Sequence, residues 1–170
     1  MTANMTTGVK ELPNGEQDAA QVRNSAVTLA GKINQVLADA LSLYLKTKNF
    51  HWHVSGPHFR DYHLMLDEQA SEILDVIDPL AERVRATGST TIRSLGQAAR
   101  LSTIADNEAE GVQAHSMLAE LMEDNNALAT SMRQAHKLCD ELEDLATSSL
   151  LDGYIDAAEK RAWFLRETSR

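Results

Sequence analysis

Apolar residues recur at steps of three and four along most of the chain, the pattern of amphipathic helices that bury one face. The first such run begins near Ser25 and continues to about residue 53. Its apolar positions are Ala30, Ile33, Leu37, Leu41 and Tyr44. Residues 1–24 are polar and show no helical period, so we expect them to form a mobile N-terminal arm ahead of a folded domain over residues 25–168.

A second helix follows after a short break. Gly56 is suited to end the first helix, and Pro57 is suited to the first turn of the next one. The second run keeps its period over Phe59, Tyr62, Leu66, Ala70, Ile73, Ile77, Ala81 and Val84. Pro79 lies inside this run and predicts a kink, because proline lacks the N–H that an interior helical residue donates.

The second half of the chain repeats the arrangement after a long connection. Residues 88–107 are rich in Gly, Ser and Thr and contain a short segment, 92–99, that could be helical. A third helix is predicted from about Glu108 and a fourth from about Ser148. Two helix pairs joined by a long crossover predict an all-α, ferritin-like four-helix bundle whose crossover contains a short helix.

Composition limits the classes of function. The 170 residues suit one domain, and a net charge of −9 disfavours binding to nucleic acid or to an anionic membrane. No apolar run resembles a signal peptide or a membrane span, so we expect a cytoplasmic location. The single cysteine, Cys139, cannot form an intramolecular disulfide, and we expect it to be a small buried side chain.

Candidate metal ligands lie on the second helix. His63 and Asp67 are four residues apart, as are Asp78 and Glu82, so each pair projects from one helix face. Both pairs share a stripe that flanks the apolar face and should therefore meet another surface. Asp67 and Asp78 lie roughly 16 Å apart along the helix axis, too far to share a metal within one chain. Two antiparallel copies related by a two-fold axis would bring the pairs together and form two such sites.

The same residues are also compatible with roles other than metal binding. A histidine and an acid four apart on a helix often form only a solvated ion pair, and His51 alone is more often a structural histidine. A di-iron centre inside the bundle is excluded, because none of the six histidines follows a glutamate by three residues. A mixed imidazole and carboxylate set suits iron or zinc, and manganese less well.

One part of the sequence resembles the Dps miniature ferritins, the DNA-binding proteins from starved cells. The matching residues are Lys48-Asn49-Phe50-His51-Trp52-His53-Val54-Ser55-Gly56-Pro57-His58-Phe59, followed by His63, Asp67, Asp78 and Ala81-Glu82-Arg83. The resemblance joins a Lys-x-x-His-Trp start, a His-x-x-x-Asp pair and an Asp-x-x-Ala-Glu-Arg end at fixed spacings. The four-helix pattern extends it over residues 25–168.

The resemblance implies a ferroxidase whose ligands come from two subunits. His51, His63 and Asp67 would come from one subunit, and Asp78 and Glu82 from a two-fold partner. Trp52 and Lys48 would lie near the site, while His53 and His58 are expected to be surface groups. The family implies Fe(II) oxidation by hydrogen peroxide, ferric mineral stored in a hollow dodecamer, and protection of DNA from oxidative damage. Zinc and manganese would be competing metals.

The resemblance also bears on iron uptake and on DNA. The Asp-x-x-Thr pattern at Asp144 matches an acid of the family's three-fold pore, so Asp144 is the candidate for the pore through which iron enters. Pro79 directly follows the ligand Asp78 and bears on the position of the second ligand pair. The N-terminal arm carries only Lys10 and Arg23 as basic residues, so we expect weak or no DNA binding; a protein that did bind DNA would associate with the nucleoid.

Two alternatives belong to other classes of function. One is a nucleoid-compacting DNA-binding protein with a weak or vestigial ferroxidase site, which would bind DNA without peroxide-driven iron oxidation. The other is a helical scaffold whose histidines are incidental, which would form a small oligomer that metal does not stabilise.

Overall fold

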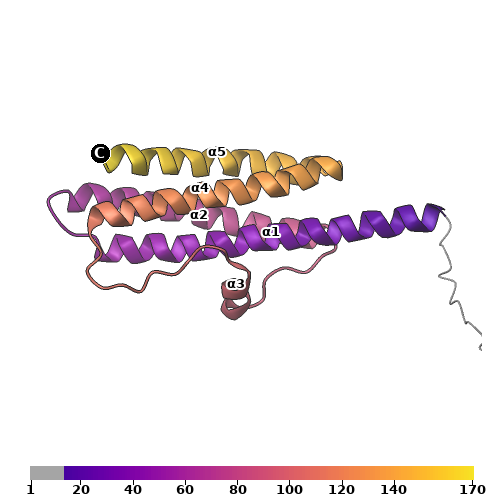
Figure 1. The fold of residues 1–170 in the computed structure, drawn as a ribbon, viewed down its shortest axis with the longest axis horizontal. Coiled ribbons are helices and arrows are strands. Elements are labelled where there is room, and N and C mark those ends of the chain that lie inside the picture. Colours follow the sequence, from indigo (N-terminus) through magenta and orange to yellow (C-terminus); the bar gives the residue numbers. More distant parts are fainter. Residues whose placement is uncertain (1–13) are drawn as a thin grey trace, which may run out of the picture.

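The computed structural model describes residues 14–170, with side chains from residue 28 onward. All regular elements in this part of the chain are helices: α1 (Asn14–His53), α2 (Phe59–Ala86), α3 (Leu95–Leu101), α4 (Ala114–Glu141) and α5 (Leu145–Thr168). The four long helices lie side by side, and the crossover from α2 to α4 runs back along the bundle with α3 beside α1 (Figure 1). The prediction of an all-α, ferritin-like bundle is confirmed.

The starts of α1, α4 and α5 differ from the predicted ones. α5 begins at Leu145, three residues earlier than predicted. α1 begins at Asn14, so part of the predicted arm is helical, while the expectation for residues 1–13 lies outside the described residues. α4 begins at Ala114, six residues later than predicted. Gly111 has φ +69°, which a right-handed helix cannot contain, so the segment before it forms a turn.

The helices meet in one apolar core. Its fully buried members include Leu43 and Phe50 of α1, Leu66 and Ile73 of α2, and Leu118 of α4. The predicted apolar stripe of α2 is buried at these positions because its three- and four-residue steps keep one face toward the core. Cys139 is also fully buried, as expected, and burial raises the pKa of its thiol to about 11.

Phe59 is the exception in the α2 stripe. Its side chain is 45% exposed, because α2 begins at this residue, at the end of the bundle. Further along, α2 continues through Pro79 to Ala86, and the predicted kink there stays a prediction.

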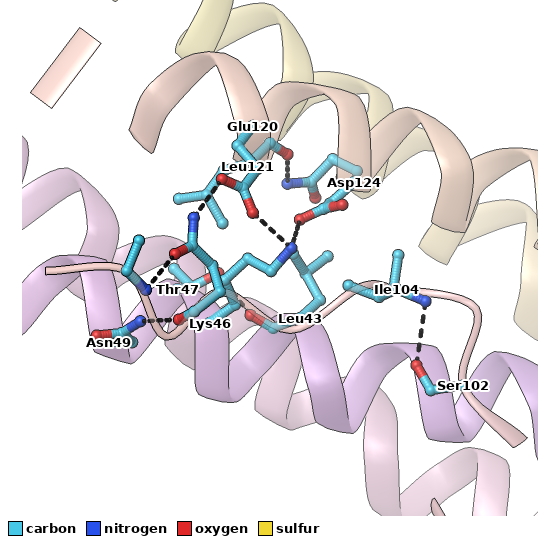
Figure 2. Close-up of polar contacts among 12 residues, drawn as sticks. Leu43, Lys46, Thr47, Asn49, Ser102, Ile104, Glu120, Leu121 and Asp124 are labelled. Atoms are coloured by element: carbon cyan, nitrogen blue, oxygen red, sulfur yellow. Dashed lines mark hydrogen bonds and ion pairs between the residues drawn. The ribbon is translucent and has the colours of Figure 1, made fainter. Parts of the chain in front are cut away.

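A polar network fixes the crossover to the bundle close to the candidate site. The ammonium of Lys46 lies 2.7 Å from Asp124 and 2.9 Å from Glu120, and the side chain is almost fully buried (Figure 2). Burial alone would lower the pKa of Lys46, but the two carboxylates outweigh it and raise the pKa. Asn49 donates to the backbone carbonyl of Asn107, whose amide donates to Glu120. The crossover is thereby tied to α1 two residues before His51.

A second anchor holds the crossover further along α1. Asp39 is buried, and its carboxylate accepts hydrogen bonds from the hydroxyl of Ser102 and from the backbone and side chain of Thr103. A buried carboxylate needs such partners, so this contact fixes where the crossover passes. Within the described residues, no helix has the length and apolar character needed to cross a membrane.

Candidate metal centre

The predicted ligands on α2 occupy one face of that helix. Asp67, Asp78 and Glu82 are exposed, and His63 is partly buried. This agrees with the prediction that the stripe lies beside the core and not in it, because steps of four, eleven and four residues return to nearly the same face. In the single chain, the stripe is therefore an open surface.

His51 joins this face from the end of α1. Its side chain is buried, with only 8% of the residue exposed, and its ring stacks on the ring of His63. The ring centroids are 3.8 Å apart and the planes differ by 20°. The short turn at residues 54–58 brings the end of α1 against the start of α2. Gly56, with φ +112°, allows the chain to reverse there.

The two histidines hold each other by reciprocal hydrogen bonds. His51 Nδ1 lies 2.8 Å from the carbonyl oxygen of His63, and His63 Nδ1 lies 2.9 Å from the carbonyl oxygen of His51. A carbonyl oxygen only accepts, so each Nδ1 carries the proton and donates it. In the neutral rings the lone pair is then on Nε2, the atom that binds a metal.

Asp67 lies next to this pair. Its Oδ1 is 3.9 Å from His51 Nε2 and 2.6 Å from the ammonium of Lys48. The hydrogen bond from Lys48 holds the pKa of Asp67 below its usual value, with smaller contributions from the charges of Lys48 and the two histidines. The structure thus places Lys48 beside a predicted ligand, and its role at a metal centre stays a prediction.

Asp78 and Glu82 are not brought to this group. They lie three and four turns further along α2, and no described side chain forms a hydrogen bond or ion pair with either. Among the residues with described side chains, no three histidines, cysteines or acids converge closely enough to hold a metal ion. Assignment of all five residues to one centre stays a prediction that requires a second chain.

The neighbouring aromatic and imidazole groups are on the surface. Trp52 is 58% exposed. His53 bonds through Nδ1 to the backbone carbonyl of Asn49, and the ring of His58 lies beside the ring of Tyr62. Both histidines are exposed, as the sequence predicts for surface groups.

Asp144 has a clear structural role at the other end of the bundle. It is the N-cap of α5, where its carboxylate accepts from the backbone N–H and the hydroxyl of Thr147 and from Arg83 at 2.6 Å. Partial burial works to raise the pKa of Asp144, but these hydrogen bonds and the guanidinium outweigh it, so the pKa lies below its usual value. The Asp-x-x-Thr pattern is therefore a helix cap, and its predicted place in a pore stays untested.

Two further residues, Phe59 and Arg83, contact the candidate site residues and were not predicted to do so. The apolar pattern predicts Phe59 in the core, whereas the centroid of its ring lies 5.1 Å from that of His63. Arg83 was noted only within a motif, whereas it bonds to both Asp144 and Thr147. Helical spacing from His63 could have indicated Phe59, four residues earlier, but nothing local links Arg83 to a residue 61 positions away.

Comparisons with known proteins agree with this fold. A family model described as a ferritin-like domain matches residues 30–170. A DNA protection during starvation protein from Brevibacillus brevis is 36% identical over 134 residues, covering 78% of this chain and 89% of the relative. DNA protection during starvation protein 1 from Deinococcus radiodurans is 34% identical over 139 residues, covering 82% and 67%. The X-ray structure of Dps from Thermosynechococcus elongatus matches with a TM-score of 0.84 at 26% identity, covering 87% of this chain and 94% of that one.

Proposed function

Because the chain belongs to the Dps family of ferritin-like proteins, we propose that it is an iron-storage and detoxification protein that oxidises Fe(II) with hydrogen peroxide. The observation that carries the proposal is the His51–His63 pair, whose Nε2 atoms are free to bind a metal beside the carboxylate of Asp67.

The donor set fits iron as a substrate. Carboxylate oxygens favour Fe(III) over Fe(II), and imidazole suits either state, so oxidation is favoured where both kinds of ligand meet. Few ligands per ion leave positions open for peroxide. Two Fe(II) ions each give one electron, and these two electrons with two protons reduce one peroxide to two water molecules. Paired oxidation therefore releases no hydroxyl radical, and DNA nearby is protected from it. Zinc and manganese would compete for the same ligands.

The second ligand pair comes from another copy of the chain. Asp78 and Glu82 are exposed and unpaired among the described residues, on the same face as Asp67. An antiparallel copy of α2 would place them opposite His63 and Asp67 and would form two centres about 22 Å apart along the paired helices. We assign these centres to the two-fold interfaces of a hollow dodecamer that stores the oxidised iron as ferric mineral.

Iron would enter this shell through a pore that includes Asp144. Arg83 and Thr147 already engage the carboxylate, so it would act in the pore together with Arg83 and not as an isolated charge. The surrounding acids Asp140, Glu141 and Glu143 would supply the field that attracts Fe(II). The variant Asp144→Asn is then expected to slow Fe(II) uptake without changing assembly.

We propose weak or absent DNA binding and a cytoplasmic location. A net charge of −9 repels the phosphate backbone, and the first 24 residues offer only Lys10 and Arg23. A gel shift seen at low salt should disappear at about 150 mM salt, because contacts with phosphate weaken steeply as salt rises. A shift that persists at that salt concentration contradicts this part of the proposal.

The function is tested by following Fe(II) oxidation without oxygen after substoichiometric peroxide is added. Wild type should oxidise Fe(II) rapidly, and the double variant His63→Ala with Asp67→Ala should not. The matched control is His58→Ala with Asp61→Ala, which removes the same residue types from exposed positions at the start of α2. Mass measurement of each assembly shows whether lost activity reflects lost ligands or lost structure. Equal rates in all three proteins would refute the ferroxidase and favour the DNA-binding or scaffold alternative.

A further inference from the structure

The contact between α4 and α5 contains a histidine that lies between two acids. On the side that faces α5, His136 Nε2 is 3.1 Å from Oδ1 of Asp152 and 2.9 Å from Oγ of Ser148. On the other side of the ring, Nδ1 is 3.4 Å from Oδ2 of Asp140. α4 and α5 run side by side (Figure 1), so this cluster joins two helices.

The sequence places these four residues in two matching pairs. His136 and Asp140 are four residues apart on α4, and Ser148 and Asp152 are four apart on α5, so each pair projects from one face of its helix. The short turn between the helices sets the two faces against each other. The cluster contains none of the five predicted iron ligands.

The charges of the cluster call for a cation beside the ring. A neutral imidazole carries one hydrogen, so His136 can donate to only one of its two carboxylates. The other ring nitrogen then turns its lone pair toward a negative oxygen. A second proton would relieve this repulsion, and so would a metal ion. A metal ion on Nε2 leaves the hydrogen on Nδ1, where it is directed at Asp140.

The distances suit a metal ion. In a tetrahedral site the ligand atoms lie about 2.1 Å from the metal and therefore about 3.4 Å from one another. His136 Nε2 has two oxygen atoms close to that separation, from Asp152 and Ser148. Asp140 occupies the place of the carboxylate that commonly orients a metal-bound histidine through its other ring nitrogen.

The cluster offers only two strong ligands, which agrees with the absence of three converging histidines, cysteines or acids among the described side chains. They are the imidazole of His136 and the carboxylate of Asp152. The hydroxyl of Ser148 is a weaker third ligand, and water would complete the coordination. Such a site exchanges its ion readily and does not bury it.

The surroundings allow a cation to enter. A hollow that opens to solvent is lined by Arg133, His136, Asp152 and Ile155. The guanidinium of Arg133 forms an ion pair with Glu159, so its charge is balanced. The acids on both sides of His136 then leave a net negative charge at the hollow, which attracts cations.

We propose that His136 and Asp152 bind a divalent first-row cation such as Zn²⁺ or Fe²⁺, with Ser148 as a third ligand and Asp140 as the residue that positions the ring. Mixed imidazole and oxygen ligands suit these ions. The site is independent of the proposed ferroxidase, because the two share no residue. A bound ion would also link the first turns of α5 to α4.

Equilibrium dialysis with Zn²⁺ at pH 8 tests the site in the full-length protein after treatment with a chelator. The parent is the double variant His63→Ala with Asp67→Ala, which lacks two predicted ferroxidase ligands. Adding Asp152→Asn should weaken zinc binding at one site per chain at least tenfold. Asp156→Asn is the matched control, since Asp156 is exposed one turn further along α5, and it should bind zinc as the parent does. Zinc held by other acids is common to both variants and cancels in the comparison.

Variants on α4 extend the test. His136→Gln should lose the same site, and Asp140→Asn should weaken it at least threefold, whereas the neighbouring Glu141→Gln should leave it unchanged. The same differences are expected when the substitutions are made in wild type, which keeps the test available if the double variant assembles poorly.

Urea unfolding without zinc separates this site from an ion pair that only joins the helices. If His136→Gln and Asp152→Asn lower stability but bind zinc as Asp156→Asn does, the cluster is an ion pair and the proposal is overturned. Equal zinc binding by all the variants overturns it as well. Either result leaves the proposed ferroxidase untouched, because that function is measured by peroxide-driven oxidation in a protein with His136 intact.

Discussion

His51 and His63 come from different helices, and each donates its Nδ1 hydrogen to the backbone carbonyl of the other while their rings stack 3.8 Å apart. This reciprocity fixes both rings with Nε2 free. It also connects the end of α1 to the first turns of α2. The two candidate metal ligands therefore also stabilise the packing of these helices. Substitutions can separate the two roles.

The variants His63→Asn and His63→Asp test the hydrogen bond from the side chain of residue 63 to the carbonyl oxygen of His51. An asparagine amide can donate to the carbonyl of His51 as Nδ1 does, whereas an aspartate carboxylate cannot donate and leaves that carbonyl facing an acceptor. The two residues are nearly isosteric and have similar helix propensity. We expect the aspartate variant to be less stable by about 1 kcal/mol or more in urea unfolding at pH 7 with a chelator present. Equal stability would show that the hydrogen bond contributes nothing.

Both variants should lose peroxide-driven iron oxidation, because neither presents a donor at the position of Nε2. The asparagine variant would then be a folded protein without a ligand. It therefore distinguishes the chemical role of His63 from its structural role more cleanly than alanine does.

The second prediction concerns Lys46 and the buried polar network that holds the crossover to the bundle. Its ammonium lies between Asp124 and Glu120, and its side chain is only 4% exposed. Lys46→Met removes the cation and leaves the two carboxylates without it, which should cost about 3 kcal/mol in free energy of unfolding. The double variant Lys46→Met with Asp124→Leu should recover part of this loss, since it also removes one of the carboxylates. A double variant no more stable than the single one would contradict this explanation.

Helical periodicity predicted the four helices and the face of α2 that carries the acids, because both depend on residues three or four apart. It could not predict that His63 lies against His51, twelve residues away, since that contact depends on how α1 packs on α2 after the turn. The family resemblance implied only that both histidines belong to one set of ligands. Phe59 was wrongly predicted to be buried for the same reason. The pattern identifies an apolar face, but it does not show where along the helix the bundle ends.

The starts of helices α1 and α5 show a further limit of prediction from local sequence patterns. The start of α5 at Leu145 is fixed by the local cap at Asp144, whereas the apolar period alone placed it at about Ser148. Its partner Arg83 comes from the end of α2, so the strength of that cap depends on tertiary structure. The start of α1 at Asn14 could not be predicted, because the polar residues before Ser25 show no apolar period.

Asp144 gives a prediction for pH dependence. Its pKa is lower in the folded chain than its ordinary value, so the folded state favours the charged carboxylate. The stability that this adds is present above the pKa of the unfolded chain, about 3.9, and is lost as the pH falls through the lower folded value. Asp144→Asn lacks this contribution, so wild type should exceed it in stability by a constant amount from about pH 7 to 5. The difference should shrink below about pH 4.

Urea unfolding of both proteins at several pH values measures this difference. Asparagine keeps a side-chain oxygen that can cap α5, so the comparison isolates the charge that faces Arg83. A difference that stays constant down to pH 3 would mean that the carboxylate gains nothing from the guanidinium.

The last prediction concerns Leu74, which lies on α2 between the two predicted ligand pairs and therefore near the two-fold axis of the proposed pairing. Leu74→Glu places a carboxylate of each copy beside the other at the proposed two-fold axis, where the two would repel and neither could keep its full hydration. Because the leucine is half exposed in the single chain, the helix itself should fold, whereas the dimer and everything built on it should dissociate. Light scattering should then report a small species with unchanged helix content by circular dichroism, and peroxide-driven iron oxidation should be lost although all five predicted ligands remain. Leu64→Glu adds the same charge to the same helix, away from the axis, and should stay assembled. If Leu74→Glu assembles and oxidises iron as wild type does, then Leu74 does not lie at the axis, and the ligand pairs must meet by a different approach of the two helices.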